Sequence, residues 1–131
     1  MTEIIIDSNA LFIPLRFKLD LVEELSKILN KNFEVIILSP VKDELQTLSS
    51  KGKTKKTKEA AFALRLSQNF KTIPVEQGKN ETVDDVIVRF SNEFNMAVFT
   101  NDKILRKRLR DISVPVIYLR EKSRLDIDGK I

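Results

Sequence analysis

Acidic side chains lie near the carboxyl ends of several apolar runs that predict β-strands. They are Asp7, Glu44, Asp84, Asp85 and Asp102. Two further polar residues, Asn9 and Thr100, lie beside them in the sequence. In an open parallel sheet, ligands bind beyond the carboxyl ends of the strands. We therefore expect these oxygen-bearing side chains to meet at one edge of a sheet.

Carboxylates gathered in this way repel one another and raise one another's pKa values, and a bound cation removes that conflict. The chain has no histidine and no cysteine, so its ligands are oxygens, which favour Mg²⁺ or Mn²⁺. One or two such ions would activate water for attack on phosphorus and stabilise the leaving oxygen. The acidic residues thus predict hydrolysis of a phosphodiester.

Each acidic residue also has a structural explanation. Asp7 and Asp102 are suited to cap the helices that follow them, and Asp85 forms part of a possible capping box with Thr82. Glu44 alone is typical of a solvated helix residue. The prediction of a metal site depends on all of them occurring together.

Composition narrows the chemistry further. The 131 residues and 15.1 kDa correspond to one domain. Without histidine or cysteine, the chain has no Ser-His-Asp triad, no imidazole acid–base catalyst and no thiol nucleophile. No apolar run approaches the roughly 20 residues that span a bilayer, and the amino terminus lacks a basic leader segment. We expect a cytoplasmic protein without a membrane partner.

Two basic stretches could bind a polyanion, which the net charge of +4 and pI of about 9.4 also allow. The first contributes Lys53, Lys55 and Lys56, and the second contributes Lys103, Arg106, Lys107 and Arg110. A solvated surface is the alternative explanation for either stretch. The second stretch follows Asp102 directly and is better placed to meet the phosphates of a nucleic acid.

Strands and helices alternate along the chain. Apolar runs predict strands at 3–6, 34–38, 72–75, 96–100 and 114–119, and amphipathic patterns predict helices at 19–30, 40–48, 59–69, 82–94 and 102–110. A short helical segment is expected after Asp7, and a loop at 49–58. This order predicts parallel βαβ units in a three-layer α/β/α domain over residues 1–120. The charged tail, residues 121–131, is assigned no secondary structure.

In this setting the chain resembles the PIN-domain nucleases from residue 4 to residue 119. The motifs that carry the resemblance are IIIDSNAL with Asp7, SPVKDEL with Glu44, VDDVIVRF with Asp84, and VFTNDKILRKRLR with Thr100 and Asp102. The closing run TNDKILRKRLRDISVPVIYLR is similar to small-subunit ribosomal RNA processing nucleases and their archaeal relatives. It is less similar to the compact toxin ribonucleases.

The resemblance implies a sheet of order 3-2-1-4-5, dependence on Mg²⁺ or Mn²⁺, an RNA substrate and a homodimer. It also implies that Asp7, Glu44, Asp84 and Asp102 are metal ligands, and that Asn9 and Thr100 orient ligands or water. The choice between Asp84 and Asp85 stays open, although the aliphatic Ile87 three residues on favours Asp84.

The leading hypothesis is a metal-dependent endoribonuclease that acts in ribosomal RNA processing. The alternatives are a toxin-type ribonuclease paired with an antitoxin, and an RNA-binding ribosome-assembly factor without catalysis. An aspartate-nucleophile phosphatase is disfavoured, because Asn9 stands where the second aspartate of such enzymes is required.

Overall fold

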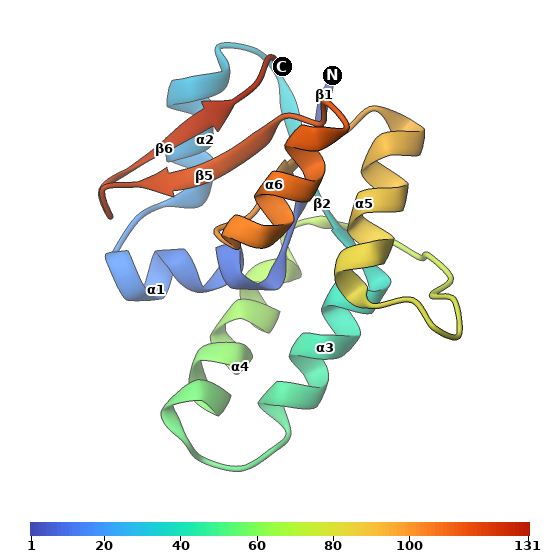
Figure 1. The fold of residues 1–131 in the computed structure, drawn as a ribbon. Helices are drawn as coiled ribbons and strands as arrows, with labels where there is room; N and C mark the ends of the chain where they lie inside the picture. Colours follow the sequence, from blue (N-terminus) through green and yellow to red (C-terminus); the bar gives the residue numbers. More distant parts are fainter.

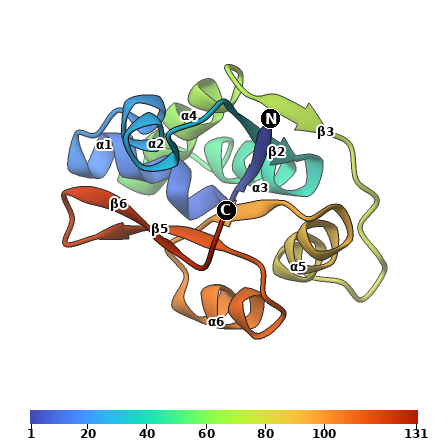
Figure 2. The same ribbon diagram turned by 90° about the horizontal axis from the view of Figure 1, so that it is seen from above.

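The sheet of this computed structural model, which describes all 131 residues, has six strands in the order β3-β2-β1-β4-β5-β6 (Figures 1 and 2). The strands are β1 (Thr2–Ile6), β2 (Phe33–Leu38), β3 (Lys71–Ile73), β4 (Ala97–Phe99), β5 (Val116–Arg120) and β6 (Arg124–Asp128). The first five are mutually parallel, and β6 is antiparallel to β5. The order 3-2-1-4-5 is confirmed, with one strand added at its edge.

Seven helical elements surround the sheet. They are the 3₁₀ helix η1 (Ser8–Phe12) and the α-helices α1 (Ile13–Phe17), α2 (Leu21–Leu29), α3 (Ser39–Ser49), α4 (Lys55–Ser67), α5 (Val83–Phe94) and α6 (Lys103–Asp111). Seen from above, α1 and α2 lie on one side of the sheet and α5 and α6 on the other (Figure 2). The helices α3 and α4 pack side by side beyond the carboxyl ends of the strands (Figure 1). No helix is both long enough and apolar enough to cross a membrane.

The central strands are buried on both faces, as their uninterrupted apolar runs predict. The side chains of Ile4, Ile5 and Ile6 are fully buried, and so are those of Ile36 and Ile37. Helices on both sides supply the apolar contacts, so one continuous core fixes the register of β1 against β2 and β4. The carboxyl ends of β1, β2 and β4 therefore stand at a common edge.

No secondary structure was predicted for the tail, residues 121–131. That prediction was wrong, because residues 124–128 form β6. The turn before it places Glu121 and Lys122 at positive φ values of 55° and 60°. Glycine or asparagine usually occupies such positions in hairpins, so these residues do not identify the turn. Only Leu125 and Ile127 are apolar in β6, and contacts from α6 described below hold its far end.

The predicted loop 49–58 was too long, because α4 begins at Lys55 and not near Glu59. Thr54 caps this helix by accepting a hydrogen bond from the Thr57 backbone NH at 3.2 Å. Lysines in a first helical turn oppose the helix dipole, so the sequence pattern favoured a loop. The third strand ends at Ile73, two residues early, since Val75 donates its NH to the Ser39 side chain at 2.9 Å instead.

Candidate active site

Asp7 occupies a buried position at the carboxyl end of β1. Its backbone NH extends the sheet by donating to the Phe99 carbonyl at 2.9 Å, and only 4% of the residue is exposed. Oδ2 accepts hydrogen bonds from Thr100 Oγ1 at 2.8 Å and Asn9 Nδ2 at 3.1 Å, and Oδ1 accepts from the Ser8 NH at 2.8 Å. No lysine or arginine pairs with this carboxylate.

Burial raises the pKa of Asp7 from 3.8 to about 6. The negative charges of Asp84 and Glu44 raise this pKa further, while the hydrogen bonds from Thr100 and Ser8 lower it. Asp84 and Glu44 thus lie close enough to Asp7 for their charges to oppose its ionisation. Ionising Asp7 is therefore unfavourable in the protein alone, as expected for a carboxylate whose ionised form is stabilised by a bound cation.

Asp102 is joined to Asp7 through Thr100. The Thr100 hydroxyl, which is fully buried, donates to Asp7 and accepts the Asp102 backbone NH at 3.1 Å. Asp102 Oδ1 caps α6 by accepting from the NH groups of Ile104 and Leu105 at 2.8 and 3.1 Å. The capping explanation for Asp102 is thus correct, yet its Oδ2 makes no hydrogen bond and stays available.

Asn9 completes the link between the ends of β1 and β4. Its Nδ2 donates to Asp7, and its Oδ1 accepts from the Asn101 backbone NH at 3.0 Å. Asn101 in turn accepts the Leu119 NH at 2.8 Å through its Oδ1. The amide of Asn9 therefore contacts both the Asp7 carboxylate and the backbone after β4.

Glu44 approaches the same edge from α3. It is exposed, and its Oε1 accepts a hydrogen bond from Ser8 Oγ at 3.0 Å. Ser8 also donates its backbone NH to Asp7, so one residue contacts two of the predicted acidic positions. The sequence did not identify Ser8 or Asn101 as members of this network, since small polar residues are common after strands.

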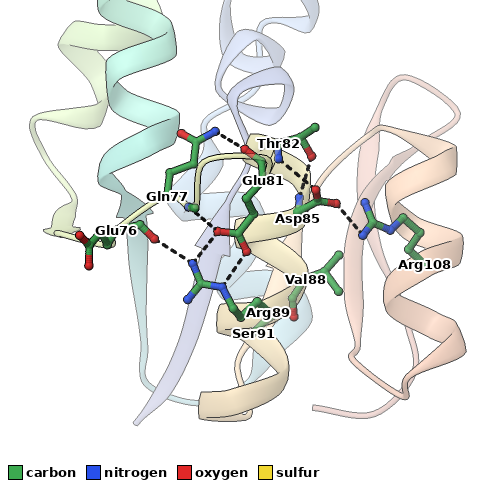
Figure 3. Close-up of polar contacts among 10 residues, drawn as sticks. Glu76, Gln77, Glu81, Thr82, Asp85, Val88, Arg89, Ser91 and Arg108 are labelled. Carbon is green, nitrogen blue, oxygen red and sulfur yellow. Dashed lines mark hydrogen bonds and ion pairs between the residues drawn. The ribbon is translucent and has the colours of Figure 1, made fainter.

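The adjacent residues Asp84 and Asp85, at the start of α5, have different surroundings. Asp85 forms a capping box with Thr82, with bonds of 3.0 and 3.1 Å, and an ion pair with Arg108 at 2.9 Å (Figure 3). Hydrogen bonds from the Thr82 backbone and then from Arg108 lower the pKa of Asp85. Burial and then the charge of Asp102 raise the pKa of Asp84. Asp84 is thus the member of the pair that faces the other carboxylates.

The loop that leads into α5 is fastened to that helix. Arg89 donates to both carboxylate oxygens of Glu81, at 2.7 and 2.9 Å, and to the Glu76 carbonyl at 2.9 Å (Figure 3). Gly78 donates its NH to Glu81 Oε1 at 2.9 Å. These contacts tie the segment before α5 to Arg89, in the middle of the helix that carries Asp84 near its amino end.

The donor set fits a hard divalent ion, since it consists of carboxylate, hydroxyl and amide oxygens. As the side chains stand, no three acidic groups converge closely enough to hold a metal ion. Mg²⁺ usually keeps several waters and takes only one or two protein carboxylates. The arrangement therefore suits an ion that is held partly through water.

The predicted RNA-binding side chains of α6 differ in their availability. Arg106 and Arg110 pair with the two carboxylate oxygens of Asp128 on β6, at 3.0 and 3.1 Å. Lys107 pairs with Asp111 at 3.1 Å, whereas Lys103 is exposed and has no ion-pair partner. Two of the four basic side chains thus fasten β6 to α6, which the spacing of charges alone does not reveal.

The lysines near the start of α4 lie apart from the acidic residues. Lys55 and Lys56 line an open cavity of about 990 Å³ between α1 and α4, together with Arg16 and Glu59. Arg16 donates to Glu59 at 2.7 Å, and Lys53 is exposed in the preceding loop. These basic groups form a second positively charged surface.

Comparison with known proteins points to one family. A family model described as "PIN like domain" matches residues 4–122. Ribonuclease VapC4 of Methanocaldococcus jannaschii is 31% identical over the whole of both chains. Ribonuclease VapC9 of Archaeoglobus fulgidus is 27% identical, covering 95% of this chain and 87% of its own.

Solved structures agree with these sequence matches. The PIN domain endonuclease Utp24 superposes with a TM-score of 0.82 at 28% identity, covering 98% of this chain and 92% of its own. VapBC2 from Rickettsia felis, bound to promoter DNA, has a TM-score of 0.62 at 18% identity, covering 89% and 98%, and supports the fold alone.

Proposed function

The chain belongs to the PIN-domain family, and from that premise we propose that it is a metal-dependent endoribonuclease. The observation that carries the proposal is the Asp7 carboxylate, which is buried, lacks a cationic partner and feels the charges of Asp84 and Glu44. Hydrolysis of RNA is supported by the two relatives of the chain that are named ribonuclease and by the structural similarity to the endonuclease Utp24.

In this proposal Asp7, Glu44, Asp84 and Asp102 hold Mg²⁺ or Mn²⁺. Asp84 is preferred to Asp85 because the capping box and Arg108 already engage Asp85. Such an ion, when bound, would lower the pKa of water and offset negative charge on the phosphate. Thr100 and Asn9 keep the Asp7 carboxylate in one orientation through hydrogen bonds to Oδ2.

Basic side chains would position the RNA strand across this edge. Lys103 is the nearest candidate, because it opens α6 directly after Asp102 and is unpaired. Lys107, Lys53, Lys55 and Lys56 could contact more distant phosphates. Arg106 and Arg110 would contribute mainly to the electrostatic potential around the site, since Asp128 pairs with both guanidinium groups.

For the substrate we propose a ribosomal RNA precursor, on the strength of the closing run TNDKILRKRLRDISVPVIYLR and the similarity to Utp24. The second candidate is a toxin-type ribonuclease with an antitoxin partner, which the two VapC relatives favour. Induced expression in the absence of any neighbouring gene separates them. Growth arrest that is relieved by co-expressing a small protein from the adjacent gene would support the toxin. Unaffected growth would support the processing enzyme.

We also propose that the chain acts in the cytoplasm, as expected from its sequence, and that it forms a homodimer, as the family resemblance implies. Light scattering of the purified protein tests the dimer: a mass near twice 15.1 kDa is expected, and a mass near that of one chain would contradict it.

The decisive experiment is cleavage of labelled structured RNA with Mn²⁺, with Mg²⁺ and with EDTA. We expect cutting with either ion, none in EDTA and none by Asp7→Asn. Asp85→Asn is the matched control, because its side chain is engaged away from the other carboxylates. Tight RNA binding without cutting by any variant would instead support a non-catalytic assembly factor.

A further inference from the structure

A small pocket adjoins the candidate active site at the carboxyl ends of β4 and β5. Its volume is about 290 Å³, and Thr100, which contacts Asp7, forms part of its wall. The remaining wall includes Lys103 and Arg106 from α6 and Tyr118 from β5. The pocket therefore begins where the network around Asp7 ends.

One side of the pocket is formed by two side chains that contact each other, Arg106 and Tyr118. The guanidinium of Arg106 lies over the ring of Tyr118, with Cζ 3.7 Å from the ring centroid. Arg106 is held there by its Nε, which donates to Asp128 at 3.0 Å, while its terminal amino groups make no hydrogen bond. Aromatic rings and guanidinium planes are the surfaces on which proteins stack unpaired RNA bases.

The charges around this stack suit a phosphate. Lys103 is exposed and unpaired, and Arg120 is paired with Asp126 at 2.7 Å. Glu121 is the one acidic residue of the wall. The cationic groups thus outnumber the acidic one, and Lys103 is the one free to move toward a ligand.

We propose that this pocket holds the nucleotide next to the scissile phosphate of a single-stranded RNA. Its base stacks on the Tyr118–Arg106 pair, and its phosphate meets Lys103. The proposal rests on the proposed nuclease function and adds a subsite to it. A nucleotide held here lies one residue, Thr100, away from the Asp7 carboxylate.

Tyr118 offers a direct probe, because the chain has one tyrosine and no tryptophan. A short single-stranded oligoribonucleotide is titrated into the protein in EDTA, which prevents cutting, with correction for light absorbed by the RNA. We expect saturable quenching of the tyrosine fluorescence. Replacing each nucleotide in turn by an abasic one should abolish quenching at a single position. Bound RNA, seen by anisotropy, that leaves the fluorescence unchanged would overturn the proposal.

Variants separate stacking from a merely structural role. With binding followed by anisotropy, Tyr118→Leu should weaken RNA binding roughly 10-fold and make the affinity insensitive to the abasic nucleotide. Tyr118→Phe should keep both the wild-type affinity and its dependence on that nucleotide. Lys103→Ala is at an exposed position and should reduce the salt dependence of binding by about one released ion. Lys31 is exposed near the amino ends of the strands, and Lys31→Ala is the matched control. It should change neither the affinity for RNA nor the salt dependence of binding. Equal effects of Lys31→Ala and Lys103→Ala would contradict the proposed subsite.

The two readouts keep this subsite and the nuclease function distinguishable. Cleavage without quenching would overturn the subsite and leave the nuclease intact. Position-specific quenching without cleavage in any metal would establish that the pocket stacks an RNA base, and would overturn the nuclease and with it the placement next to a scissile phosphate.

Discussion

Thr100 Oγ1 donates a hydrogen bond to Asp7 Oδ2 at 2.8 Å, joining two residues 93 positions apart in the chain. The same hydroxyl accepts the backbone NH of Asp102. Because Thr100 is fully buried, water cannot replace either contact. One side chain therefore sets the relative positions of two acidic groups that come from different strands.

Replacing Thr100 by valine should damage the site with little change of shape. The valine side chain would keep the volume but could not donate to Asp7, so the carboxylate would lose one of its two orienting partners on Oδ2. Groups that orient metal ligands typically contribute about 10–100-fold to metal affinity or activity. We expect a loss of about that size in metal-dependent cleavage, with Thr100→Ser close to wild type. Equal losses in the serine and valine variants would show that packing matters more than the hydroxyl.

Asp7→Asn should stabilise the metal-free protein above about pH 6. The pKa of Asp7 is raised from 3.8 to about 6, so as pH rises the unfolded chain loses this proton first, and folding becomes less favourable between those two values. A shift of that size corresponds to roughly 3 kcal/mol. Asparagine avoids this cost. It also loses an acceptor oxygen, which lowers the free energy of unfolding by about 1 kcal/mol and so reduces the net gain.

Thermal unfolding in EDTA measures this difference. The melting temperature of Asp7→Asn should exceed that of the wild type at about pH 8, and the advantage should disappear near pH 4, where folded Asp7 is protonated and its ionisation no longer opposes folding. Added Mn²⁺ should reverse the order at the higher pH, because only the wild type presents the carboxylate. A constant difference across the whole range would contradict the raised pKa.

The parallel sheet and the acidic edge could be predicted because both depend on local patterns. Uninterrupted β-branched runs such as Ile4–Ile6 require cover on both faces, and the order of elements then fixes which ends carry Asp7 and Asp102. No such pattern identified β6. Its hairpin turn uses Glu121 and Lys122 at positive φ, and two apolar residues are too few to indicate a strand.

The ion-pair partners of charged side chains were harder to predict than the positions of the carboxylates at the strand ends. Arg106 and Arg110 share one helix face with Lys107 beside it, and only the folded position of Asp128 shows that both guanidinium groups are engaged. Similarly, Asp84 and Asp85 are indistinguishable in sequence. Their roles separate only once Arg108 from the following helix contacts one of them.

Exchanging each of these two aspartates for asparagine should give opposite phenotypes. Asp84→Asn should abolish metal-dependent cleavage and leave the melting temperature unchanged or higher, since burial and neighbouring carboxylates raise the pKa of Asp84. Asp85→Asn should lower the melting temperature by weakening the capping box and the Arg108 ion pair, yet keep most of the activity. Cleavage assays and thermal unfolding on the same samples provide the comparison. Full activity in Asp84→Asn would assign the metal to other residues.

Asp128→Asn should loosen β6 and expose positive charge at the same time. Asp128 pairs with both Arg106 and Arg110, and all three side chains are about one-third exposed. We expect a loss of roughly 1 kcal/mol in stability, seen as a melting temperature a few degrees lower. The two released guanidinium groups should strengthen RNA binding at low salt and steepen its salt dependence. Asp126→Asn, whose partner is Arg120 on the neighbouring strand, is the matched control and leaves Arg106 and Arg110 paired. Weaker RNA binding by Asp128→Asn would mean that the order of β6, and with it the Tyr118–Arg106 stack, matters more to RNA than the added charge.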